Sequence, residues 1–191
     1  ISGTHGVEGY CGSGPQIGFL REGRFDDLPP ETGIVIVHAI NPYGFAHDRR
    51  VNEDNIDLNR NFIDFDAEPP DSPGYADLHL ALVPEAWDGP AREAADAAIN
   101  AYKAREGLPA FQQVTSRGQY AFPDGLFFGG TGPSWSRHTI EGFARARLAR
   151  AERIAVVDFH TGLGPRGYGE VIGRGGPGDP AAGDPAAGGA R

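Results

Sequence analysis

Residues 33–40 read GIVIVHAI, and residues 154–160 read IAVVDFH. Both runs are short, nearly continuous and rich in β-branched side chains, which is typical of strands buried on both faces of a mostly parallel sheet. The turn-forming residues 41–44 (NPYG) follow the first run directly. The two runs therefore predict two buried strands, and the second strand would carry His160 at its carboxyl end.

Helical patterns surround these runs. Residues 10–21 predict a helix despite Pro15, and the alanine-rich residues 91–106 predict a second helix that Gly107 closes. Residues 136–150 are amphipathic and predict a third helix. Strands that alternate with helices indicate an α/β three-layer sandwich with a mostly parallel mixed sheet. In such sheets, functional sites form beyond the carboxyl ends of the strands.

Both ends of the chain look incomplete as parts of a domain. Residues 1–5 read like the end of a strand, so residues 1–172 are expected to be one partial domain and the chain to be a fragment. Residues 173–191 are almost entirely Gly, Pro, Ala, Asp and Arg, and GDPAA occurs at 178–182 and again at 183–187. Such a tail buries too little apolar surface to offset its chain entropy, so we expect it to be disordered.

Composition excludes several classes of partner. The net charge of −9 argues against nucleic-acid binding, which depends on Lys and Arg. There is no basic run to suggest a membrane surface and no apolar stretch near the ~20 residues that span a bilayer. The single cysteine, Cys11, excludes a disulfide framework and a cysteine-based zinc site, and we expect it to be buried. A cytoplasmic protein is the expectation.

Three residues predict a metal site. His5 and Glu8 are three positions apart in a glycine-rich segment, a spacing that can close on one ion across a single turn. His160 would join them from the end of the second predicted strand. His138 and Glu141 have the same spacing, but they lie on the amphipathic helix, where such pairs are usually surface partners. A hydrolytic zinc ion takes three protein ligands of this kind and keeps one position for water.

Neighbouring residues refine this prediction. Asp158 lies two residues before His160, on the same face of the predicted strand. Its carboxylate could bond the imidazole of His160 and orient that ring toward the metal without binding the metal itself. His38, His47 and His79 are expected to be structural or to face solvent. A serine hydrolase is set aside, because Ser13 has no Gly-x-Ser-x-Gly motif around it.

The segment 49–62, RRVNEDNIDLNRNF, is the most specific run of the chain. A guanidinium beside an amide is suited to clamp a carboxylate, because Arg offers paired donors in a rigid fork. A second Arg nearer the metal could stabilise the oxyanion that forms when water attacks a carbonyl. The alternative is an Asx-rich surface loop whose charges pair with one another.

Taken together, these motifs resemble a known superfamily. His5-x-x-Glu8, then DLNRNF at 57–62, then Asp158-Phe159-His160 resemble the zinc metallocarboxypeptidases, which include the aspartoacylase-like amidohydrolases. The sequence segments SGTHGVEG, NPYGFAHDRRVNEDNIDLNRNF and FHTGLGPRGYGE resemble more closely a carboxypeptidase-like family that is described as a domain of unknown function (number 2817). The resemblance extends from residue 1 to about 172.

The resemblance implies a role for each matching residue. It implies a Zn²⁺ ion held by His5, Glu8 and His160. Asn59 and Arg60 would bind a substrate carboxylate, and Arg50 would polarise the scissile carbonyl, with Arg49 as the alternative.

The superfamily's general base is harder to place. It lies well downstream of the third metal ligand, and here Glu170 is the single candidate outside the repeats. The base is therefore expected to lie beyond the chain. The expected function is hydrolysis of a peptide or amide bond next to a free carboxylate, on a small-molecule or peptide substrate. The alternative is a non-catalytic module that binds zinc or a carboxylate.

Overall fold

The computed structural model describes residues 1–162, 165 and 167–169 of the 191-residue chain. The chain divides into two compact units, residues 1–160 and residues 161–191, and all the elements described below belong to the first unit. The expected domain boundary at residue 172 and the expected disordered tail at residues 173–191 lie outside the described residues.

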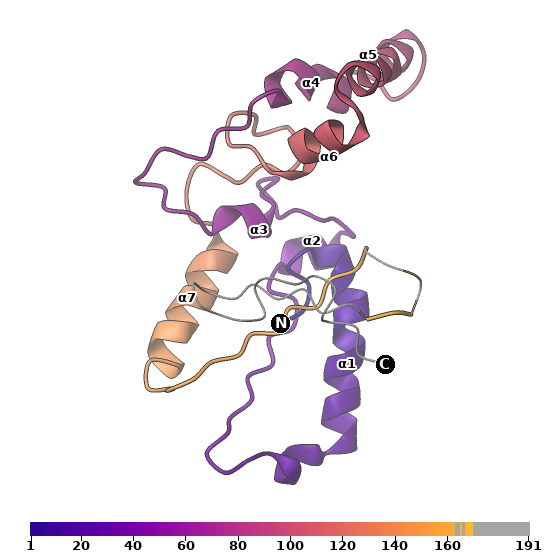
Figure 1. Ribbon diagram of the computed structural model, residues 1–191. Coiled ribbons are helices and arrows are strands. Elements are labelled where there is room, and N and C mark those ends of the chain that lie inside the picture. Colours follow the sequence, from indigo (N-terminus) through magenta and orange to yellow (C-terminus); the bar gives the residue numbers. More distant parts are fainter. Residues whose placement is uncertain (163–164, 166, 170–191) are drawn as a thin grey trace. The chain divides into compact units, whose positions relative to one another are not determined.

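Helices account for the regular structure of the described residues. There are seven α-helices and two 3₁₀-helices there, joined by long extended or irregular segments, and no β-strand (Figure 1). In chain order they are η1 (Gly6–Glu8), α1 (Gly9–Glu22), η2 (Arg24–Asp27), α2 (Pro42–Ala46), α3 (Leu58–Asn61), α4 (Tyr75–Leu82), α5 (Pro90–Glu106), α6 (Leu108–Ser116) and α7 (Trp135–Arg147). The predicted α/β three-layer sandwich is therefore wrong for this part of the chain.

The two β-branched runs explain why that prediction failed. Residues 33–39 and 153–158 form no strand, and their side chains lie largely in solvent, with Val35 46%, Val156 68% and Val157 63% exposed. A strand needs a hydrogen-bonded neighbour along its length, and β-propensity reflects packing on such neighbours more than an intrinsic backbone preference. Along these two runs, hydrogen-bonded backbone neighbours are present only near the carboxyl ends.

Those ends meet at the start of the chain. The N–H of Ser2 donates to the carbonyl of Val37 at 3.0 Å, and the N–H of Ile40 donates to the carbonyl of Ser2 at 3.1 Å. On the other side, Phe159 forms a parallel bridge with Ser2, and its N–H donates to the carbonyl of Ile1 at 3.1 Å. Residues 1–4 are thus held between the carboxyl ends of both runs.

The prediction of three helices is confirmed. The three predicted helices are present as α1, α5 and α7, and α1 continues through Pro15. Gly23 ends α1 with a left-handed backbone (φ 64°), a conformation that glycine adopts readily. The side chain of Ser134 caps α7 by accepting from the N–H of Arg137. Cys11 lies exposed on α1, so the expectation that it is buried is wrong.

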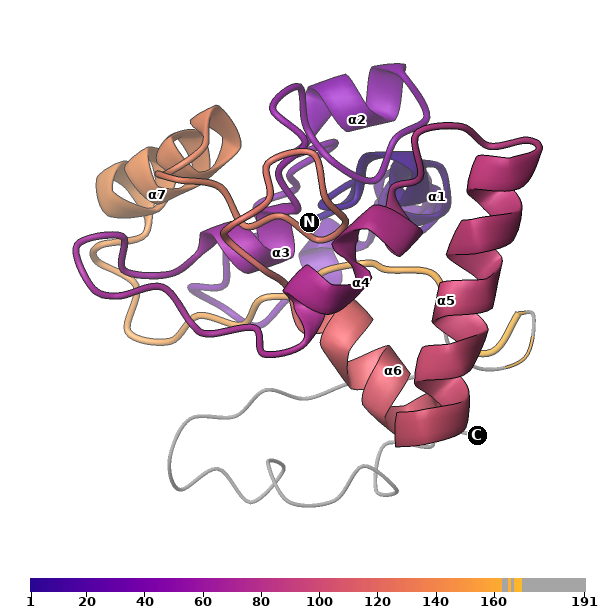
Figure 2. The same cartoon turned by 90° about the horizontal axis from the view of Figure 1, so that it is seen from above.

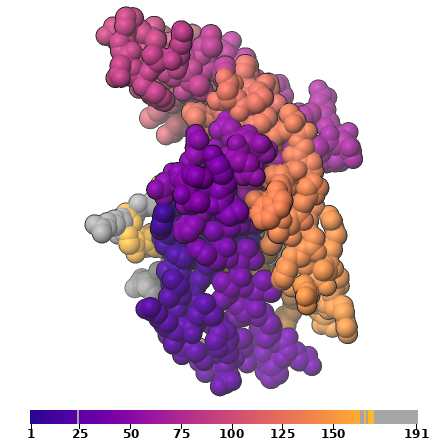
Figure 3. Space-filling model, turned by 180° about the vertical axis from the view of Figure 1, so that it is seen from behind, coloured from indigo at the N-terminus to yellow at the C-terminus, as the bar shows by residue number. Residues whose placement is uncertain are grey.

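A small core lies beside the site described below. Ile56, Leu58 and Phe128 are buried together, with Ile40 packed against them. Helices α4, α5 and α6 pack on one another in sequence, as the view from above shows (Figure 2). Residues 149–157, which follow α7, are exposed (Figure 3). Among the described residues, no helix combines the length and apolarity needed to cross a membrane.

Candidate metal centre

One 3₁₀ turn brings His5 and Glu8 together. The N–H of Glu8 donates to the carbonyl of His5 at 2.9 Å across η1. Gly6 lies so close to α2 that a Cβ atom there would stand 2.0 Å from the carbonyl carbon of Gly44. Because only glycine allows this approach, Gly6 fixes where the turn lies and therefore where Glu8 lies.

The same turn is tied to the arginine segment. The N–H groups of Gly6 and Val7 donate to the carbonyls of Arg50 at 3.3 Å and Arg49 at 3.1 Å. Asn41, which caps α2 through its Oδ1, also donates from Nδ2 to the carbonyl of Arg50 at 3.2 Å. The backbone of the arginine pair is therefore placed against η1.

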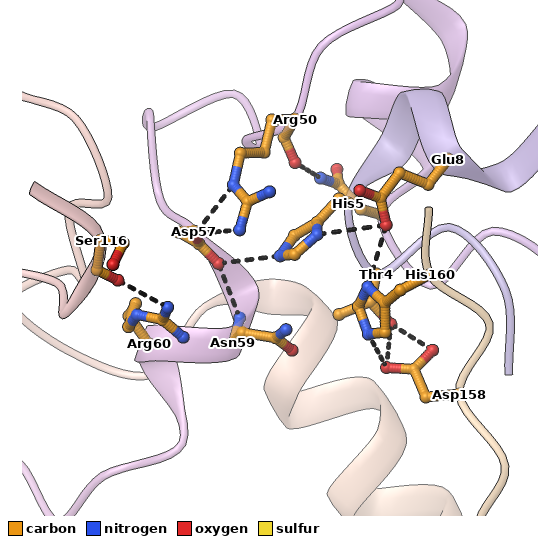
Figure 4. A network of polar contacts seen from close by, with 11 residues as sticks. Thr4, His5, Glu8, Arg50, Asp57, Asn59, Arg60, Ser116, Asp158 and His160 are labelled. Carbon is orange, nitrogen blue, oxygen red and sulfur yellow. Dashed lines mark hydrogen bonds and ion pairs between the residues drawn. The ribbon is translucent and has the colours of Figure 1, made fainter. Parts of the chain in front are cut away.

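His160 reaches this turn from the far end of the first unit. The bridge between Ser2 and Phe159 and a hydrogen bond from the amino group of Ile1 to the carbonyl of Val157 (2.7 Å) set its position. Its Nδ1 then lies 2.9 Å from Oε2 of Glu8. Two segments more than 150 residues apart in sequence thus meet side by side (Figure 4).

The predicted ligands form one cluster. One ligand atom from each of His5, Glu8 and His160 lies within 4.8 Å of the other two, so the three side chains converge on one point. Nδ1 of His5 is buried, and its contact with Oε2 of Glu8, at 3.3 Å, is a long ion pair rather than a well-formed hydrogen bond. Two imidazole nitrogens and a carboxylate oxygen gathered in this way are a donor set that zinc uses, so the residues present fit a metal site.

Each histidine is held from behind by an aspartate. Nε2 of His5 lies 3.3 Å from Oδ1 of Asp57, and Nε2 of His160 lies 2.9 Å from Oδ2 of Asp158. A carboxylate accepts hydrogen bonds, so each aspartate favours a proton on Nε2, and Nδ1 is the nitrogen of each ring that lies beside Glu8. Thr4 in turn donates to both oxygens of Asp158 at 2.9 Å. The contact expected between Asp158 and His160 is confirmed.

The pKa values follow from these contacts. Hydrogen bonds to Asp158 and Glu8 raise the pKa of His160 to about 9. Burial by itself would lower the pKa of His5, but its bonds to Asp57 and Glu8 outweigh burial and leave that pKa above its usual value. Burial would likewise raise the pKa of Asp57, yet its bond with His5 holds it below its usual value. In the metal-free chain, therefore, protonated histidines and ionised carboxylates attract one another across this cluster.

Arg50, rather than Arg49, stands beside the cluster. Its Nε and Nη2 both lie 3.0 Å from the same oxygen, Oδ2 of Asp57, which accepts from the two nitrogens together. Asp57 is fully buried, whereas the side chain of Arg50 is half-buried. Arg49 is exposed, and it is the carbonyl of Arg49 that contacts the turn. The structure thus brings Arg50 to the site, with Asp57 between it and His5.

Asn59 and Arg60 leave α3 in different directions. Asn59 is exposed and its side chain extends toward the side on which His160 lies, whereas Arg60 points toward Ser116 (Figure 4). Nη2 of Arg60 donates to the carbonyl of Ser116 at 2.8 Å. The structure therefore does not bring Arg60 to the three candidate ligands. Glu170, the candidate base, lies outside the described residues.

The remaining histidines stand apart from the cluster, as expected. His38 bonds the hydroxyl of Ser2, His79 stacks on Phe122, and His47 is exposed. His138 is also exposed on α7. Its predicted partner Glu141 pairs instead with two arginines of that helix, Arg137 and Arg145.

Sequence reasoning missed two residues of the site, Asp57 and Thr4. Both stand inside the quoted motifs, DLNRNF and SGTHGVEG. The usable signal was the one applied to Asp158: a histidine that binds metal needs a carboxylate for its other nitrogen. What sequence could not show is that Asp57 would be the partner of His5, 52 residues away.

Neither a curated protein nor a solved structure is significantly similar to this chain. A family profile, however, matches it almost from end to end, over residues 1–187, and so covers the described cluster, the arginine segment and α1 to α7. On this match, the chain belongs to the family described as "Protein of unknown function (DUF2817)".

Proposed function

We propose that the chain is a zinc-dependent hydrolase of peptide or amide bonds next to a free carboxylate, of the carboxypeptidase or aspartoacylase-like type. The observation that carries this proposal is the cluster of His5, Glu8 and His160, with ligand atoms within 4.8 Å of one another. The burial of His5 and the aspartates behind both histidines support it. Zinc bound there would supply a Lewis acid and an acidified water.

The chain's own residues supply the other functions. Asp57 and Asp158 orient the imidazoles of His5 and His160, so that both Nδ1 atoms face the cluster. Arg50 has guanidinium donors beside His5 and would stabilise negative charge on a substrate carbonyl.

Asn59 and Arg60 are proposed to bind the substrate carboxylate. The exposed amide of Asn59 can donate directly on the side of His160. Arg60 contributes once it exchanges the Ser116 carbonyl for the stronger, charged acceptor.

Amide hydrolysis by the zinc-loaded chain tests this proposal. N-acetyl amino acids and the same compounds as methyl esters of the α-carboxylate form a matched pair, because the scissile amide is identical in both. The proposal predicts hydrolysis that a chelator abolishes, that zinc restores, and that the free acid supports better than the ester. Hydrolysis that persists in excess chelator would contradict it.

A non-catalytic module that binds zinc or a carboxylate is the second candidate, and one observation favours it. The carboxylates that contact the cluster in the described part of the chain, Glu8, Asp57 and Asp158, each bond a histidine, and Glu170 lies outside that part. The module predicts zinc binding and carboxylate binding without turnover of any amide in the same assay.

A further inference from the structure

Phe127 has an unusual backbone beside the arginine segment. Its φ is 54°, in the left-handed region that a bulky side chain rarely occupies. Such a conformation is costly and persists only where surrounding contacts impose it, most often at functional sites.

Hydrogen bonds on both sides fix this backbone. The carbonyl of Phe127 accepts from the N–H of Gln119 at 3.1 Å, and the carbonyl of Phe128 accepts from the N–H of Asp57 at 2.8 Å. The buried side chain of Gln119 bonds the loop between them, accepting from the N–H of Phe122 at 2.7 Å and donating to its carbonyl at 2.7 Å. Asp57, the partner of His5, is therefore joined directly to the loop that presents Phe127.

The ring of Phe127 lies against two guanidinium groups. The Cζ atom of Arg50 stands over the ring at 4.9 Å from its centroid, and that of Arg60 at 6.0 Å. A cation within about 6 Å of an aromatic face is attracted to it, so the Arg50 contact is the stronger of the two. Arg50 is thus held by a carboxylate at its Nε and Nη2 and by a ring at its face.

We propose that Phe127 is a positioning residue, whose left-handed backbone presents its ring to Arg50 and so keeps that guanidinium on Asp57 beside His5. This inference rests on the proposed function, in which Arg50 stabilises charge on the substrate carbonyl. Phe127 acts on substrate only through Arg50.

The side-chain Nε–H signal of Arg50 in NMR spectra of the zinc-loaded 191-residue chain tests this role, with Arg50→Lys identifying the signal by its loss. Phe127→Gly removes the ring and accepts a positive φ without strain, so the loop keeps its backbone. Hydrogen exchange of the Arg50 Nε–H is expected to be roughly five- to tenfold faster in this variant, the size of effect that a cation–π contact gives. Phe127→Tyr keeps the ring and is expected to exchange like the wild type.

Phe122→Leu is the matched control, because that ring belongs to the same loop but stacks on His79. Its Arg50 exchange should match the wild type, and zinc content should be unchanged in all three variants. Unchanged Arg50 exchange in Phe127→Gly would overturn the inference, as would equal acceleration in Phe122→Leu. Amide hydrolysis that persists in excess chelator refutes the proposed function, while the Arg50 signal still decides the role of Phe127.

Discussion

Asp57 joins the two chemical groups of the site. It is fully buried, bonds Nε2 of His5 through one oxygen, and pairs with Arg50 through the other. Its N–H donates to Phe128, and its Oδ1 also accepts from the N–H of Asn59 at 3.0 Å. A substitution of this one carboxylate therefore removes a contact of His5 and a contact of Arg50 together.

The variant Asp57→Asn is expected to weaken zinc binding by about 10- to 100-fold, the usual effect of losing a carboxylate behind a metal-binding histidine. The amide keeps the size of the side chain but loses the charge that holds the Nε2 proton of His5 and the fork of Arg50. Competition with a chromophoric chelator measures the dissociation constant. Asp54→Asn, in the exposed part of the same loop, is the control and should bind zinc like the wild type.

Protonation of His160 gives the metal-free site a pH dependence. Its pKa is raised above the ordinary 6.5 to about 9 by Asp158 and Glu8, so the folded chain holds this proton more tightly than the unfolded chain. The resulting stabilisation of the metal-free protein is complete below pH 6.5 and is lost as pH rises toward 9. Zinc needs the neutral ring, so zinc affinity should rise over the same window.

Zinc binding at pH 7 should accordingly release protons. Titration calorimetry in two buffers with different ionisation enthalpies measures this release, because each released proton adds the enthalpy of its uptake by the buffer. We expect the difference in apparent binding enthalpy between the two buffers to correspond to the release of at least about one proton per zinc at pH 7, and of clearly less at pH 9.5. Identical enthalpies in both buffers at pH 7 would show that His160 is already neutral.

Among the elements, η1 sets the positions of His5 and Glu8 because its backbone packs closely against α2. Gly6 contacts Gly44 and Phe45 of α2, and no Cβ fits between them. Gly18, by contrast, lies within α1, where a Cβ would meet nothing within 4 Å. The same substitution at these two positions should therefore have opposite effects.

We expect Gly6→Ala to destabilise the chain by about 1–3 kcal/mol through overpacking, and to weaken zinc binding because η1 carries Glu8. Gly18→Ala should stabilise it by about 0.5–1 kcal/mol, because alanine loses less backbone freedom in a helix, with zinc affinity unchanged. Urea unfolding and zinc competition on the same samples measure both quantities. Equal stability of the two variants would show that η1 does not pack on α2 as described.

Local patterns predicted the elements that depend on local interactions. The helices α1, α5 and α7 appear close to the expected residues, because caps, alanine content and 3.6-residue periodicity act within a few turns. The runs at 33–40 and 154–160 were read wrongly as strands, because a strand depends on neighbours elsewhere in the chain. In the described residues, their apolar side chains are exposed or only partly buried, and only their carboxyl ends are paired.

For the molecule as a whole, the cluster was predictable where the fold was not. His5, Glu8 and His160 meet because residues 1–4 bind the carboxyl ends of both runs, and this pairing needs no continuous sheet. The motifs identified the three residues that meet, while the partnership of Asp57 with His5 and the direction of Arg60 depend on tertiary contacts that spacing does not encode.

Zinc stoichiometry tests the central claim, that His5, Glu8 and His160 hold one metal ion. The 191-residue chain, loaded with zinc and passed over a desalting column, is measured by mass spectrometry of the metal. The account predicts about one zinc per chain, lost in His5→Ala and in His160→Ala and kept in His138→Ala, whose histidine is exposed on α7. Zinc that stays bound at the wild-type level in His5→Ala and His160→Ala would contradict it.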